Sequence, residues 1–197
     1  MNLDMSFFGT EDFYKVLQID LFEGVKDIYE NNFHDLHMVL DNYKTRSKDF
    51  LRYLHNYLSS FATLTDHCRV LLKKCHEASE TVRKRIQSDL ATLPSNNFLK
   101  DLRNYTLHHS LPLTMREVKQ LDGRLIVGDL MWSRSSLLKW KGWNAQSYLY
   151  LNSLEGDIRI KELLVEHYNR IAAFYNWLEE YLLELYSDAF IKYKNLP

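Results

Sequence analysis

The chain has 197 residues, of which 25 are Lys or Arg and 26 are Asp or Glu, so its formal net charge is −1. This length fits one domain, and a composition of 46% hydrophobic and 26% charged residues excludes general disorder. With only 6 Gly and 3 Pro, the chain has too few turn-forming residues for a β-sandwich, a β-barrel or a many-turned α/β fold, and its balanced charge argues against non-specific binding to nucleic acid.

Four long segments are predicted to be helices because their apolar residues recur at three- and four-residue steps. These segments span about residues 11–43, 46–76, 96–109 and 157–190. A shorter helix is expected over 80–92, where Pro94 ends it and Ser95 or Asn96 caps the next helix. Long amphipathic helices with short connections favour an all-α, up-and-down helical bundle.

Residues 114–132 differ from the rest of the chain because Asp122-Gly123 separates two short runs of mixed polar and β-branched residues. An Asp-Gly pair in this setting predicts a β-hairpin with a type I′ turn. Two short helices are expected after it, near 134–140 and 143–153. We therefore interpret residues 1–197 as a single helical domain in which 114–153 form a hairpin and short-helix insertion.

The segment from Lys100 to His109 holds the most informative polar residues. A neutral imidazole can take the proton of a ribose 2′-OH, and an imidazolium can protonate the leaving oxygen. A guanidinium can bind the phosphate oxygens and stabilise their growing charge. Arg103 and His108 therefore suit attack on a phosphodiester, which needs no metal. Tyr105 is expected to stack an unpaired base, and Lys100 to contact the substrate.

The sequence Arg-Asn-Tyr-Thr-Leu-His at 103–108 resembles the R-[N/D/H]-xxx-H motif, more generally R-x4–6-H, of HEPN-domain proteins. These proteins are bundles of four or five helices, and many are metal-independent endoribonucleases in toxin–antitoxin, CRISPR and phage-defence systems. The resemblance implies a HEPN-like bundle in which Arg103 and His108 are the catalytic pair and Asn104 and His109 support them. It also implies RNA as substrate, a homodimer with a composite cleft, and a protein regulator or antitoxin as a further partner.

A structural interpretation of the same residues stays open beside the enzymatic one. Arg103 can instead pair with a carboxylate such as Asp101 or one from another helix, and His108 and His109 can cap the helix C-terminus, where the helix dipole favours a cation. The chain would then be a non-catalytic protein-interaction module.

Neither interpretation includes a metal, a cofactor or a membrane partner. No apolar run approaches the length of a membrane span, and residues 1–13 lack the basic and apolar regions of a signal peptide, so we expect a cytoplasmic protein. Cys68 and Cys75 fall two turns apart on one predicted helix, which is too far for a disulfide.

Overall fold

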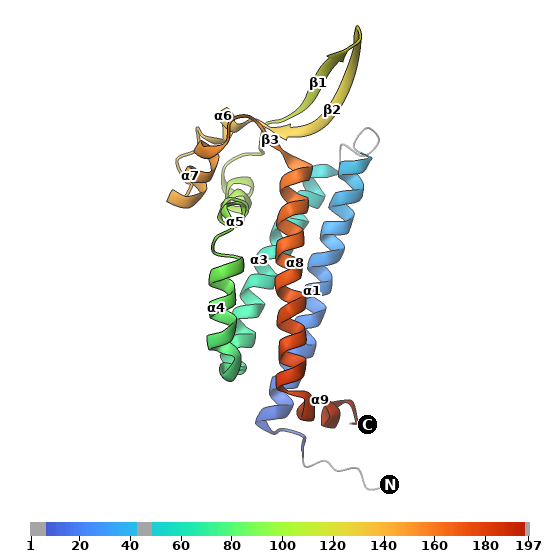
Figure 1. Cartoon of the computed structure of the whole chain (residues 1–197), viewed down its shortest axis with the longest axis vertical. Helices are drawn as coiled ribbons and strands as arrows, with labels where there is room; N and C mark the ends of the chain where they lie inside the picture. The colour runs from blue at the N-terminus through green and yellow to red at the C-terminus, as the bar shows by residue number, and fades with distance from the viewer. Residues whose placement is uncertain (1–6, 43–48, 196–197) are drawn as a thin grey trace.

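A computed structural model describes residues 7–42 and 49–195, which form a mainly helical structure with one small three-stranded antiparallel sheet. Three long helices lie side by side along the molecule: α1 (Glu11–Asp41), α3 (Phe50–Lys74) and α8 (Ile160–Leu185) (Figure 1). Each buries one apolar stripe with helical spacing, which includes Phe22 on α1, Leu64 on α3 and Leu178 on α8. The predicted mainly helical architecture is thus confirmed.

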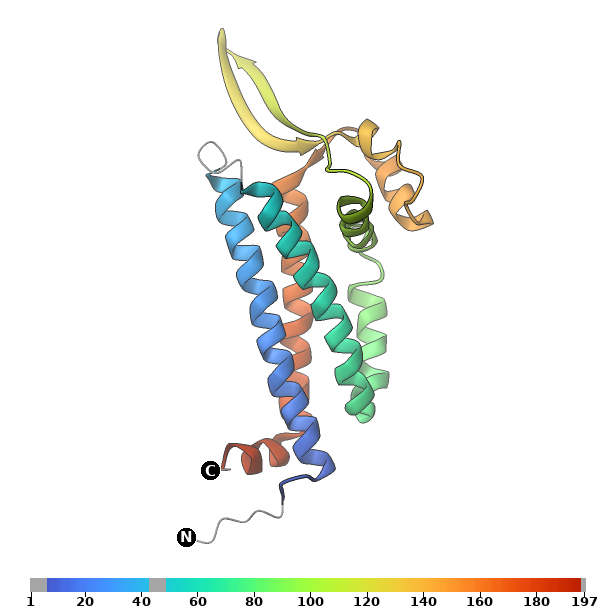
Figure 2. The same ribbon diagram turned by 180° about the vertical axis from the view of Figure 1, so that it is seen from behind.

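Two shorter helices complete one side of this bundle. After the 3-10 turn η2 (His76–Ala78) comes α4 (Ser79–Asp89), followed by α5 (Pro94–His108), which carries the motif and lies beside α3 (Figure 2). The predicted caps of α5 are wrong, because the helix already begins at Pro94, with Leu93 at its N-cap. Proline suits the first helical turn because its fixed φ is helical and no backbone N–H is needed there.

A β-hairpin projects from the end of the bundle where α8 begins (Figures 1 and 2). Its strands are β1 (Thr114–Leu121) and β2 (Arg124–Trp132), and a two-residue strand β3 (Ile158–Arg159) pairs with the base of β2. Asp122 and Gly123 both have positive φ, 48° and 74°, which confirms the predicted hairpin turn. Trp132 is fully buried at the base, so the hairpin is anchored there.

The chain after the hairpin first covers α5, then runs along the bundle as α8 and turns at its far end (Figure 1). The helices α6 (Arg134–Leu137) and α7 (Ala145–Ser153) lie over α5, where Trp143 packs on Phe98. The predicted single helix over 157–190 is wrong, because α8 ends at Leu185 and α9 (Ser187–Lys194) turns away beyond Tyr186 (Figure 1). Among the described residues, none of the helices combines the length and apolarity that crossing a bilayer requires.

Candidate functional site

The motif helix α5 and its neighbour α3 enclose a hollow of about 170 Å³, which we call the α3–α5 groove. The α3 side is lined by Leu58, Phe61, Ala62, Thr65, Asp66 and Arg69, and the α5 side by Lys100, Arg103 and Asn104. On α5, the apolar residues Leu99 and Leu102 are fully buried and attach the helix to the bundle. Helical spacing then places Lys100, Arg103 and Asn104 together along the border of this buried face.

The α3–α5 groove carries three cationic side chains and one carboxylate. Arg69 forms an ion pair with Asp66, with 2.7 Å between Nη1 and Oδ1. The other two cations, Lys100 and Arg103, are half-buried, and the Nε atom of Arg103 is buried without a hydrogen-bond partner in the described part of the chain. A buried donor without an acceptor is costly, so this groove favours an anionic ligand.

Lys100 is the residue most strongly affected by this environment. Burial and then the positive charge of Arg69 lower the pKa of Lys100, while its Nζ lies 5.9 Å from the centre of the Phe61 ring. A bound anion would relieve both the desolvation and the repulsion.

A second hollow of about 300 Å³ adjoins the α3–α5 groove and shares four of its lining residues, Phe61, Thr65, Arg69 and Lys100. Its remaining lining is mostly apolar, with Cys68, Leu72, Ile86, Leu90, Ala91 and Ile171, and includes the rings of Phe174 and Tyr175 and the amides of Asn96, Asn97 and Gln146. Asn96 donates a hydrogen bond to the Leu90 carbonyl, and Asn97 donates one to Gln146. Amides and aromatic rings are side chains that hydrogen-bond and stack on nucleobases. Together, the two hollows offer charged groups beside neutral polar and aromatic groups.

A buried imidazole lies behind the groove, on the other side of Phe61. His167 on α8 is fully buried, and its ring meets that of Phe61 edge-on at 4.6 Å. The Nδ1 atom of His167 is 2.8 Å from the Tyr57 hydroxyl, which in turn contacts the Tyr29 hydroxyl. Burial, aided by the positive charge of Lys100, lowers the pKa of His167 to about 3, so this imidazole is neutral. No expectation from the sequence included His167, although it lies four residues from both Leu163 and Ile171 on the buried stripe.

The structure divides the residues that the sequence singled out between two environments. Lys100, Arg103 and Asn104 share the α3–α5 groove, whereas His108 is exposed at the end of α5 and does not line it. The carboxylate suggested as a partner for Arg103 is engaged elsewhere, because Asp101 accepts a hydrogen bond from the backbone N–H of Asn144 at 2.9 Å.

Tyr105 and His109 face the opposite side of α5. Tyr105 is only 5% exposed and its ring stacks on Trp143 at 5.6 Å, so the predicted stacking of this ring on an unpaired base does not fit the structure. The ring of His109 packs on Trp140, with 6.0 Å between ring centres. These contacts attach α5 to the segment that covers it.

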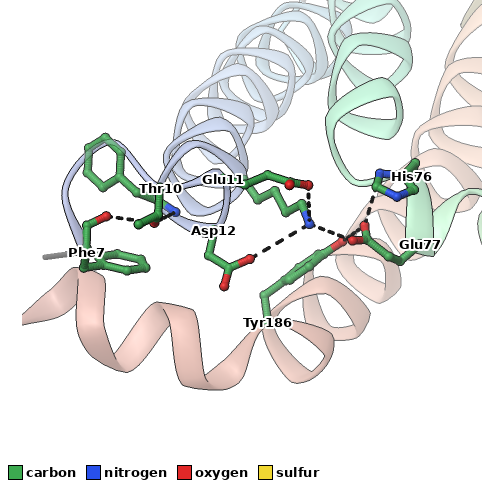
Figure 3. Close-up of polar contacts among 9 residues, drawn as sticks. Phe7, Thr10, Glu11, Asp12, His76, Glu77 and Tyr186 are labelled. Carbon is green, nitrogen blue, oxygen red and sulfur yellow. Dashed lines mark hydrogen bonds and ion pairs between the residues drawn. The ribbon is translucent and has the colours of Figure 1, made fainter.

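Another cluster of charged residues lies at the opposite end of the bundle and is an ion-pair network. Glu11, His76 and Glu77 come close enough together to share a metal ion. The carboxylates of Glu11 and Glu77, however, surround the ammonium group of Lys15, whose Nζ lies 2.9 Å from Glu11 Oε1 and 2.6 Å from Glu77 Oε1. Figure 3 shows Tyr186 joining the same network, and its hydroxyl donates to Glu77 at 2.8 Å. The lysine therefore occupies the position that a cation would take.

Comparison with known proteins assigns the chain to no family. It matches no protein-family model, no curated protein and no solved structure.

Proposed function

We propose that this chain is a HEPN-like RNA-binding protein that holds the phosphate backbone of single-stranded RNA in the α3–α5 groove and cleaves it without a metal. The convergence of Arg69, Lys100 and Arg103 on one hollow with a single carboxylate carries this proposal. Guanidinium and ammonium groups neutralise phosphates and release counterions, which accounts for binding despite a net charge near zero. The adjoining aromatic and amide-lined hollow is where we place an unpaired base.

In the proposed reaction, Arg103 binds the scissile phosphate and His108 moves the protons. The 2′-OH attacks the phosphorus, the bond to the 5′-oxygen breaks, and the products are a 2′,3′-cyclic phosphate and a 5′-OH end. His108 does not line the groove that holds Arg103, so the imidazole comes from a second copy of the chain, in a composite cleft of a homodimer.

Binding and cleavage are tested separately. Binding of a labelled single-stranded RNA is measured against salt for the wild type, Arg103→Ala, Lys100→Ala and a control variant, Lys192→Ala, which removes an exposed cation from α9. Each groove variant is expected to weaken binding and to reduce the salt slope by about 0.7, the value for one phosphate contact on a single strand. Equal binding by all four proteins would contradict the proposed groove.

Cleavage is measured with the same RNA in the presence of EDTA. We expect a 2′,3′-cyclic phosphate product from the wild type and none from His108→Ala. Activity that disappears with the chelator, or that survives in His108→Ala, would refute the mechanism while leaving RNA binding intact.

The second candidate function is a non-catalytic protein-interaction module, which the exposed apolar side chains of the hairpin favour. Leu125, Val118 and Leu121 are all more than half exposed, which is unusual for a cluster of apolar residues on one small element. This alternative predicts no RNA cleavage and no effect of Arg103→Ala on partner binding.

A further inference from the structure

The projecting hairpin leaves one strand edge and several apolar side chains uncovered. The strand order of the sheet is β1-β2-β3, so β1 is an edge strand whose outer side pairs with no other strand in the described residues. Such an edge presents a row of backbone donors and acceptors that can pair with another strand. Beyond Leu130, Met131 and Trp132 at the base, the apolar residues of the hairpin stay exposed, with Leu125 at 73% and Val118 at 58%.

A two-stranded ribbon of this kind is marginally stable in water by itself. Only its base packs on the helices, where Trp132 is fully buried and Leu130 is 6% exposed. The distal half, from Val118 to Val127, has no layer behind it among the described residues. A further strand alongside β1 would extend the sheet and cover part of this surface.

The sequence of β1 is complementary to itself when two copies run antiparallel with Val118 opposite Val118. In that register Glu117 lies opposite Lys119 of the second copy, and Lys119 lies opposite Glu117 of the second copy. Met115 and Leu121 form an apolar pair in the same way, and both are exposed in the single chain. Opposite charges and apolar pairs directly across two strands each stabilise their pairing, whereas like charges oppose it.

The geometry points to a second copy of this chain as the occupant of the β1 edge. We infer that two chains pair antiparallel through β1, centred on Val118, and form a continuous six-stranded sheet in the order β3-β2-β1-β1-β2-β3. The inference does not depend on RNA binding, because it uses no residue of the α3–α5 groove.

The local contacts of the hairpin favour β1 over β2 as the pairing edge. Glu117 is held by Arg159, with 3.2 Å between Nη2 and Oε1, and by Lys119 of its own strand at 3.0 Å. Within one chain, the Glu117 carboxylate therefore already lies beside Lys119. In the proposed pair, Lys119 of the second copy would bring a further ammonium group to the same carboxylate. The strand β2 is less suited, because its base is already paired with β3. The register of the hairpin shifts at Glu117, where this one residue of β1 faces two residues of β2, Gly128 and Asp129, so the extra residue belongs to β2.

The test measures the mass of the full chain in solution by sedimentation over a range of concentrations. The wild type is expected to approach twice the chain mass of 23.6 kDa. Lys119→Glu and Glu117→Lys each place like charges opposite each other at two positions, and each is expected to raise the dimer dissociation constant about tenfold or more. Arg124→Glu is the matched control, because it reverses a charge on the same hairpin outside the β1–β1 pairs.

Mixing the two single variants gives the decisive measurement. A dimer of one Lys119→Glu chain and one Glu117→Lys chain again has opposite charges at both positions. The mixture is therefore expected to dimerise, although each variant alone dimerises weakly. The double variant Glu117→Lys/Lys119→Glu is expected to dimerise like the wild type. Lys119→Glu leaves the contact between Glu117 and Arg159 in place, so its effect does not depend on disturbing that contact.

Three results would each overturn the inference. One is a wild-type chain that stays monomeric at about 100 μM, a concentration well above the dissociation constants of stable dimers. Another is a pair of single variants that dimerise as tightly as the wild type. The third is a mixture that shows no gain over its two components, which would mean that Glu117 and Lys119 do not face each other across the interface.

Discussion

The buried imidazole of His167 predicts a specific dependence of stability on pH. His167 is fully buried, and its pKa in the folded protein is lowered to about 3, against about 6.5 in an unfolded chain. Between these two values the unfolded chain binds a proton that the folded protein excludes, so the free energy of unfolding falls as the pH falls below 6.5. From pH 7 to pH 5 this single group should remove about 2 kcal/mol of stability.

His167→Gln removes the titrating group and keeps a side chain that can hydrogen-bond to Tyr57. We expect this variant to lose about 2 kcal/mol less than the wild type between pH 7 and pH 5, whatever its stability at pH 7. The measurement is urea unfolding followed by circular dichroism at both pH values. His55→Gln is the control, because His55 is exposed on α3. An equal loss of stability in the wild type and in His167→Gln would refute the argument that this imidazole is buried and neutral.

Two further predictions concern the ion-pair network and the cysteines. The network lowers the pKa of Glu77 to about 2, chiefly through its hydrogen bond to Lys15, so its contribution to stability is present above about pH 4.5 and is lost as the pH falls towards 2. The Glu77 side chain is 42% exposed, and solvent screening therefore limits the free energy of unfolding that Lys15→Met loses at pH 7 to about 1 kcal/mol. Urea unfolding should show that the difference between this variant and the wild type is smaller at pH 3. Burial raises the pKa of Cys68 to about 12 and that of Cys75 to about 11, so a thiol reagent at pH 8 should modify neither cysteine until denaturant is added; fast reaction in the native protein would contradict their burial.

Local features of the sequence predicted local features of the structure. Asp122-Gly123 specified the hairpin because a type I′ turn needs two consecutive residues that tolerate positive φ. The apolar periodicity located the long helices because the spacing of apolar residues shows which face of each helix is buried. The end of α8 was missed because the periodicity continues past Tyr186, although the chain turns there.

The α3–α5 groove could not be predicted in this way because it depends on which helices become neighbours. Arg69 and Lys100 belong to different helices, and only packing of α5 against α3 brings them to one hollow. Packing of Trp140 and Trp143 on the other side of α5 likewise decides that Tyr105 is buried, although the spacing of the motif alone left its ring available for stacking. His167 went unnoticed because an isolated histidine on an apolar stripe gives no sequence signal that distinguishes it from an ordinary core position.

The helix that presents the motif also constrains how any cleavage can occur. The helix α5 is continuous through His108, and five residues along an α-helix correspond to a rotation of about 140°, so Arg103 and His108 leave it in different directions. Arg103 lines the α3–α5 groove and His108 does not, so one chain holds the Arg103 guanidinium in the groove without the His108 imidazole beside it. Under the proposed function, a single chain is sufficient to bind RNA, whereas two chains are needed to cleave it. RNA binding per chain should therefore be independent of protein concentration, whereas the cleavage rate per chain should rise with it until dimerisation is complete.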